Sequence, residues 1–193
     1  MDKKIKTPEK IITSTIECIE RHGFDALTVR MIADAAEVNI AAVNYHFHSK
    51  ENLVEQVKKI TFDHMLEDLK DMSEGDKPFK EIARDMCLYM LEGGARFPYI
   101  TRMHFHEAFA HGNTDVQSYK DLNELLKRFA DRISKKNNIN RKELNMALHR
   151  LFGNLLFVSI FPGIFKDFTA YSLKDDAQAR VEFAEGMVAD LPF

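Results

Sequence analysis

The side chains best suited to metal chemistry gather in His104-Phe105-His106-Glu107-Ala108-Phe109-Ala110-His111. A zinc protease needs the spacing His-Glu-x-x-His, because two imidazoles four residues apart share one helix face. Here the second histidine falls one position later. Five residues turn a straight helix by ~500°, which leaves the two rings about 140° apart. We therefore expect no catalytic metal, while a sensory metal site using two of these histidines and Glu107 remains open.

Nothing else in the chain suggests catalysis. The sequence has no glycine-rich phosphate loop and no nucleophile motif. With 193 residues, 45% of them apolar, and a net charge of −3, the composition is that of an ordinary globular protein. We predict a protein that is not an enzyme and that needs no cofactor.

Residues 28–50 have the pattern of two short helices joined by a tight turn. The helices are expected from Val29 to Ala36 and from Ile40 to His46, each preceded by an N-cap, Thr28 and Asn39. The expected inward-facing residues are Ile32, Ala33 and Ala36 in the first helix, and Ile40, Val43 and Phe47 in the second. Helices this short need neighbours to be stable, so the pattern predicts a helix-turn-helix whose second helix enters a DNA major groove.

The outer face of the second helix has suitable chemistry for base recognition. Small Ala41 and Ala42 let the backbone approach the bases, and the Asn44 amide can form two hydrogen bonds with adenine. Tyr45 is either a DNA contact or a packing aromatic, and His46 either contacts phosphate or is a buried, hydrogen-bonded histidine. The full expected face is Asn39, Ala41, Ala42, Asn44, Tyr45 and His46.

The segment from Ile11 to Val57 resembles the DNA-binding domain of the tetracycline-repressor (TetR) family of bacterial transcriptional regulators. The residues that carry the resemblance are Gly23-Phe24, Leu27-Thr28-Val29, Ile32-Ala33, Ala36, Val38, Tyr45-His46-Phe47, Ser49-Lys50-Glu51 and Leu53. The chain departs from the family at Glu37, where glycine is usual, and at Asn44, where tyrosine is common. A left-handed backbone at Glu37 would cost roughly 1 kcal/mol.

The resemblance implies further DNA contacts and a mode of action. Tyr45 and Lys50 would bind phosphate, and Thr28 and Arg30, which open the supporting helix, are similar candidates. It also implies a homodimer on palindromic operator DNA, a small-molecule effector in the second domain that releases the DNA, and most often repression. The two half-sites of such a dimer lie about 34–36 Å, or a multiple of that, apart.

The cysteines and the lack of a targeting or membrane-spanning segment predict a cytoplasmic protein. Residues 1–60 are balanced in charge, so any basic footprint depends on local placement, beginning with the basic segment 1–6. Cys18 and Cys87 have no metal-type spacing and are expected to be buried thiols. We find no secretory signal and no apolar run long enough for a membrane span.

The remainder of the chain predicts only helices, so the fold class is all-α with about nine helices. An N-terminal domain of residues 1–57 carries the helix-turn-helix, and residues 58–193 form a helical ligand-binding and dimerisation domain. Outside the helix-turn-helix, the expected helices cover 7–22, 50–72, 79–91 (ended by Gly93-Gly94), 98–110, 115–136, 140–161 and 173–191.

The helix over 140–161 is apolar almost all the way round and must therefore be covered on both sides. One cover is the chain's own core, and the other is expected to be a second subunit, which together with the last helix gives an intermolecular four-helix bundle. The alternative is a central helix in a monomeric core. The expected interface residues are Leu148, Phe152, Leu155, Leu156, Ser159, Phe183 and Met187.

Flexible and aromatic side chains between residues 86 and 119 are candidates for the effector cavity that the resemblance implies. Plain core packing is the alternative for each of them. The expected lining is Met86, Met90, Arg96, Met103, His104, Glu107 and Tyr119. Two other functions stay open: a helical DNA-associated or partner-binding protein without effector control, and a metal-sensing regulator.

Overall fold

The computed structural model describes residues 6–193, so the basic segment expected at 1–6 lies, apart from Lys6, outside the described residues. The described part contains eleven helices, nine of them with seven residues or more, and no strand. The predicted all-α fold is confirmed. In order, the helices are α1 (Thr7–His22), α2 (Val29–Ala35), α3 (Ile40–Phe47), α4 (Lys50–Glu74), α5 (Phe79–Arg96), α6 (Pro98–His104), α7 (His106–His111), α8 (Gln117–Asn137), α9 (Arg141–Ile160), α10 (Lys166–Thr169) and α11 (Ala177–Ala189).

The first three helices and the start of α4 share one apolar core. It includes Ile19 of α1, Ile32 of α2, Phe47 of α3 and Leu53 of α4. Ile100 and Met103 of α6 complete the same core from far along the chain. The N-terminal helices are therefore packed against the second half of the protein.

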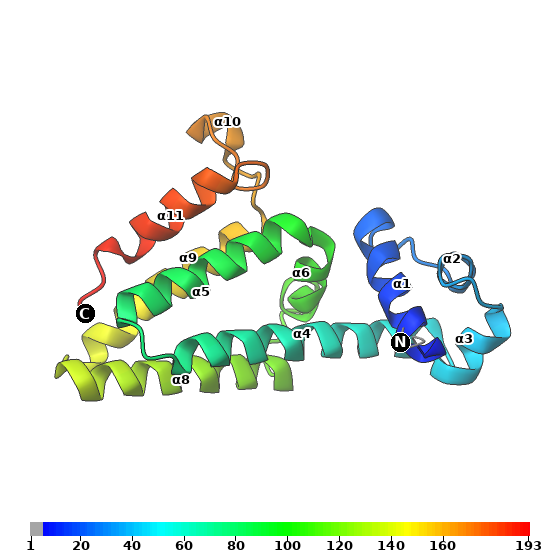
Figure 1. Cartoon of the computed structure of the whole chain (residues 1–193), viewed down its shortest axis with the longest axis horizontal. Helices are drawn as coiled ribbons and strands as arrows, with labels where there is room; N and C mark the ends of the chain where they lie inside the picture. The colour runs from blue at the N-terminus through cyan, green and yellow to red at the C-terminus, as the bar shows by residue number, and fades with distance from the viewer. Residues whose placement is uncertain (1–5) are drawn as a thin grey trace, which may run out of the picture.

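α4 is the long element that connects the two halves, and it runs without a break across residue 57. Figure 1 shows α1–α3 at one end of α4, while α8 lies along its other part. α5 packs against both α9 and α11. A large core of residues from α4, α5, α8, α9 and α11 fills the space between these helices.

α5 does not end at Gly93-Gly94 as expected but continues to Arg96. Gly94 is buried where α5 crosses α9, and a Cβ there would lie 2.8 Å from the Cα of Ser159. Glycine costs a helix about 1 kcal/mol relative to alanine, but here it permits a close helix crossing. The prediction was wrong because it treated these glycines as a helix stop.

The single helix expected over 98–110 is broken into α6 and α7 at Phe105, whose backbone leaves the helical region (φ −107°, ψ 10°). The Phe105 ring is buried and stacks on Tyr119 of α8, with 5.8 Å between ring centroids. Both cysteines are free and buried, as predicted, and burial raises the pKa of Cys87 to about 12. Within residues 6–193, no helix has the length and apolar character needed to cross a bilayer.

Candidate DNA interface and ligand cavity

The helix-turn-helix forms with the predicted caps. The Thr28 hydroxyl accepts a hydrogen bond from the backbone N–H of Met31, at 3.2 Å. The Asn39 side chain accepts one from the N–H of Ala42, at 2.7 Å. Ser49 does the same for α4 through the N–H of Asn52, at 3.1 Å. These bonds satisfy N–H groups that a helix start leaves unpaired, and they fix the direction of each short helix.

The turn between α2 and α3 keeps a left-handed residue at Glu37, with φ of 51°. The exposed Glu37 carboxylate lies 2.9 Å from Nζ of Lys10 in α1. The hydrogen bond from Lys10 and its charge lower the pKa of Glu37. The turn therefore has the conformation expected where the family has glycine, and it carries an ion pair to α1 as well.

α3 is anchored by one face and exposed by the other. Val43 and Phe47 are buried in the N-terminal core, as predicted. Ala41 and Asn44 are exposed, and Ala42 is half-buried. Ile40 was expected to face inward but is 46% exposed. It is the first residue of α3, and the core reaches this helix only from Val43 onward. It therefore adds an apolar group to the face that contains Asn44.

The expected phosphate contacts lie on α3 and at the starts of α2 and α4. Tyr45 is 79% exposed and makes an edge contact with the half-buried ring of His46. Arg30 is exposed, with Nε 3.9 Å from the Asp34 carboxylate. Lys50 is the first residue of α4. Asn39 uses its carbonyl oxygen for the cap, which leaves its amide N–H groups to donate.

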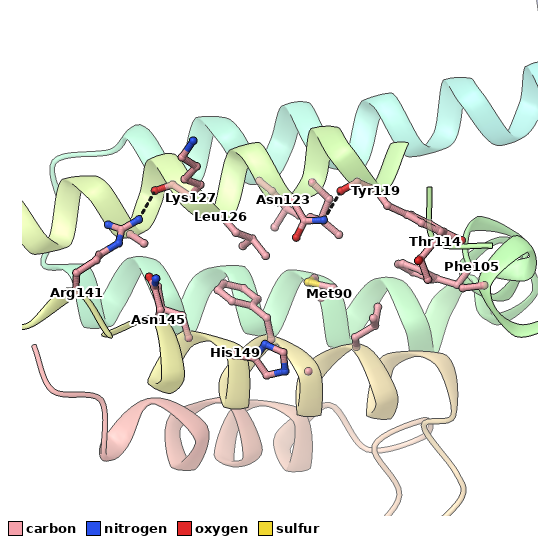
Figure 2. A pocket seen from close by; sticks show the side chains of 18 residues that line it. Met90, Phe105, Thr114, Tyr119, Asn123, Leu126, Lys127, Arg141, Asn145 and His149 are labelled. Carbon is pink, nitrogen blue, oxygen red and sulfur yellow. Dashed lines mark hydrogen bonds between the residues drawn. The ribbon is translucent and has the colours of Figure 1, made fainter. Parts of the chain in front are cut away.

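A cavity of about 650 Å³ lies between α4, α5, α8 and α9, close to the α6–α7 break. Figure 2 shows Lys127, Arg141 and Asn145 at one end and Phe105 and Tyr119 at the other. Apolar side chains, mainly leucines, make up most of the wall between them. The lining residues are Leu69, Met90, Phe105, Ala108, Thr114, Tyr119, Leu122, Asn123, Leu126, Lys127, Ala130, Arg141, Asn145, Leu148, His149, Phe152, Gly153 and Leu156.

Of the residues expected to line a cavity, Met90 and Tyr119 do so. Met86 is fully buried in the large core, and Met103 belongs to the core of the N-terminal helices. The other three lie elsewhere: Arg96 is exposed at the end of α5, His104 is buried against α4, and Glu107 is on α7. Most of the wall comes from α8 and α9. The expectation considered residues 86–119, which do not show where these two helices lie.

Sequence comparison finds relatives for the N-terminal third. The family described as bacterial regulatory proteins, tetR family, matches residues 11–57. YttP of Bacillus subtilis (strain 168), a probable HTH-type transcriptional regulator, is 39% identical over 54 residues, 28% of this chain and 26% of YttP. IcaR of Staphylococcus aureus (strain Newman), the HTH-type negative transcriptional regulator of the biofilm operon icaADBC, is 35% identical over 57 residues, 30% of this chain and 31% of IcaR. These matches span less than a third of either relative.

Solved structures extend the likeness in fold to nearly the whole chain. A TetR transcriptional regulator from Legionella pneumophila has a TM-score of 0.67, with 97% of both chains covered at 19% identity. FadR from Bacillus subtilis in complex with stearoyl-CoA has a TM-score of 0.60, covering 92% of this chain and 97% of FadR at 16% identity. Residues 11–57 therefore match the TetR family in sequence, and the fold of nearly the whole chain is similar to that of solved TetR-type regulators.

Several residues expected at a dimer interface are buried by the chain itself. Leu148, Phe152 and Leu155 belong to the large core, and Ser159 is buried at the crossing with Gly94. Leu156 lines the cavity, while Phe183 and Met187 of α11 are only partly buried. The sequence could not show which side of α9 packs in the chain's own core and which side is left for a partner, because both sides contain apolar residues.

The uncovered face of α9 is marked by residues with helical spacing. Met146, Arg150, Asn154 and Phe157 are all exposed, and Arg150 and Asn154 line a groove beside Met187 of α11. Exposed Phe165 makes a tilted ring contact with Phe157. These residues form a surface on which a second subunit can pack.

Residues 104–106 connect the cavity with the N-terminal helices. Nε2 of His104 lies 2.8 Å from Oγ1 of Thr61 in α4, and the Tyr119 hydroxyl donates to the His104 carbonyl at 3.2 Å. The His106 ring makes an edge contact with the ring of Phe24, at 5.0 Å between centroids. Burial, with a smaller contribution from the charge of Lys58, lowers the pKa of His104 to about 4, so the ring is neutral near pH 7.

α1 is held to α6 by a further contact that the sequence analysis missed. The Glu20 carboxylate accepts hydrogen bonds from the backbone N–H of Ile100 at 2.6 Å and of Tyr99 at 3.3 Å. Burial raises the pKa of Glu20 in spite of these bonds. No motif contained Glu20 or Thr61, and the motif that contained Phe24 did not indicate its contact with His106, because each of these roles depends on the position of α6 and α7.

Proposed function

We propose that the protein is a DNA-binding transcriptional repressor that acts as a homodimer on a palindromic operator. The observation that carries this proposal is the surface of α3, where Ala41, Asn44 and Tyr45 are exposed above the buried side chains of Val43 and Phe47. An anchored short helix with a small-residue face fits the major groove. The similarity of the N-terminal segment to IcaR, a negative transcriptional regulator, supports repression as the direction of control.

Asn44 is the proposed base reader, and Ile40 with Ala41 supplies apolar contact for thymine methyl groups. Lys50, Tyr45, Thr28 and Arg30 are the proposed phosphate contacts. Asn39, Ala42 and His46 complete the surface. Substitution of a phosphate contact should weaken binding to DNA of any sequence. Substitution of a base contact should reduce the preference for the operator over other sequences.

Fluorescence anisotropy with two labelled duplexes tests the division. One carries the DNA upstream of the protein's own coding sequence, and the other a shuffled version. We expect Asn44→Ala to reduce the preference between them by about 1–3 kcal/mol, and Lys50→Ala to weaken both and to lower the salt slope by about 1. Lys174→Ala, which removes an exposed charge near the C-terminal end, is the control. Equal losses on both duplexes for Asn44→Ala would exclude its role as base reader.

We further propose that the cavity binds a small effector with a long apolar part and a polar or acidic end. The mainly apolar wall supports the first part, and Arg141, Asn145 and His149 at one side support the second. The fold neighbour FadR was solved with stearoyl-CoA, which is a molecule of this general character. The effector would release DNA only if it binds the two conformations of the dimer with different affinity.

Decanoate and decan-1-ol are matched probes for the effector class, since they share an apolar chain and differ in charge. We expect decanoate to bind more tightly and to weaken operator binding. Gly153→Leu should reduce both effects, because Gly153 lines the cavity and a Cβ there meets nothing within 4 Å. Binding of both probes without any change in DNA affinity would exclude the proposed release mechanism for this class.

A further inference from the structure

The histidines at the two ends of α7 lie close together although five positions separate them. Donor atoms of His106, Glu107 and His111 are all within 4.8 Å of one another, and the two imidazole centroids are 5.6 Å apart. The expectation that a five-residue spacing prevents convergence was therefore wrong. α7 has only six residues, bounded by the break at Phe105 and by the left-handed Gly112, so the geometry of a long straight helix does not apply.

We propose that His106, Glu107 and His111 bind one divalent transition-metal ion, with Zn²⁺ as the favoured ion. Two imidazoles and one carboxylate are a donor set that zinc uses, at about 2.0–2.2 Å from the metal, with a further position left for water. Donors around a tetrahedral ion lie nearer to one another than 4.8 Å, so small side-chain rotations complete the site. The two histidines also favour Ni²⁺ and Cu²⁺ over Mg²⁺ or Ca²⁺.

The three side chains are accessible to an ion from solution. His106 and Glu107 are half-buried and His111 is exposed. The site is separate from the proposed cavity, because none of the three lines it. It is equally separate from the DNA face of α3.

The position of His106 links this site to the N-terminal helices. Its ring packs edge-on against Phe24, which lies between α1 and α2 and packs on the core of the DNA-binding helices. The neighbouring residues His104 and Phe105 contact Thr61 and Tyr119. A bound ion would fix the rotamer of His106 at this contact. Metal occupancy should therefore alter DNA affinity, a second step that rests on the proposed function.

The first experiment measures binding of Zn²⁺ to the full chain by calorimetry, and the visible spectrum of bound Co²⁺. We expect one ion per chain, bound at least tenfold more weakly by His111→Ala and by Glu107→Gln, and a Co²⁺ spectrum typical of four ligands. His64→Ala is the matched control, because His64 is an exposed histidine outside the cluster, paired with Asp68. Glu107→Gln keeps the shape of the side chain, so it remains informative if His111→Ala folds poorly.

Absence of Zn²⁺ binding, or equal binding by the wild type and both cluster variants, would overturn the site. The second step is tested by DNA affinity with and without Zn²⁺, where we expect a change of roughly tenfold in the wild type that Glu107→Gln abolishes. An unchanged affinity would overturn the coupling and leave the site intact. A protein that binds Zn²⁺ at the cluster but never binds DNA would instead contradict the proposed function.

Discussion

Nε2 of His104 lies 2.8 Å from Oγ1 of Thr61, in a position where the imidazole is almost fully buried. Thr61 belongs to the helix that begins beside the DNA face, and His104 belongs to the segment that closes one end of the cavity. The bond therefore joins the two regions to which the proposed function assigns DNA recognition and effector binding.

Burial of His104 makes stability depend on pH. Its pKa is lowered from 6.5 to about 4, so at pH values between these limits the unfolded chain takes up a proton that the folded protein does not. The stabilising contribution is complete above pH 6.5 and is lost as the pH falls, up to about 3 kcal/mol by pH 4. Urea unfolding at several pH values should show a shallower fall for His104→Gln than for the wild type. Parallel curves would contradict the buried, neutral ring.

Glu37 holds a left-handed backbone that glycine adopts without strain. Glu37→Gly should raise the free energy of unfolding by roughly 1 kcal/mol. Removal of the exposed ion pair with Lys10 offsets only a small part of this gain, because solvent and salt screen exposed ion pairs. Lys10→Ala, which removes the same pair and keeps the strain, should give no gain in thermal unfolding. A loss of stability in Glu37→Gly as large as in Lys10→Ala would show that the turn is unstrained.

Gly94 and Gly93 form a matched pair in α5. Gly94→Ala places a Cβ 2.8 Å from the Cα of Ser159 and should destabilise the protein by about 1–3 kcal/mol through forced separation of α5 and α9. Gly93→Ala meets nothing within 4 Å and should be neutral or stabilising by up to about 1 kcal/mol. Denaturant unfolding of the two variants measures the difference. Equal effects would rule out a close crossing at Gly94.

The uncovered face of α9 should contain the dimer contacts. Phe157 is 41% exposed there, and we expect Phe157→Asp to convert the dimer to a monomer in sedimentation experiments. Phe97→Asp is the control, because this phenyl ring is similarly exposed, at 40%, but lies at the end of α5. A wild-type protein that sediments as a monomer would contradict the proposed dimer, and a Phe157→Asp variant that stays dimeric would exclude this face of α9 as its interface.

Local chemistry made the N-terminal elements predictable. The caps Thr28, Asn39 and Ser49 and the buried positions Val43 and Phe47 follow from side-chain type and helical spacing. Ile40 has the same spacing but is exposed, because spacing defines a face of the helix and not how far along it the core extends.

Features that depend on how distant helices meet were not predictable. Glycine often ends a helix, but Gly94 lies inside α5 and allows α9 to pack close to it. The break at Phe105 accompanies its stacking on Tyr119 and, with Gly112, bounds the short helix that holds His106 and His111. Most of the cavity wall comes from α8 and α9, so the residues expected from 86–119 included only a small part of it. The roles of Asn44 and Lys50 on DNA remain predictions.

A DNase I footprint on the DNA upstream of the protein's own coding sequence tests the central claim most directly. The account predicts two protected half-sites related by a two-fold axis, with centres about 34–36 Å or a multiple of that apart. Asn44→Ala should abolish them at protein concentrations where the wild type protects both. Uniform protection along the fragment, or an identical footprint with Asn44→Ala, would contradict recognition through the exposed face of α3.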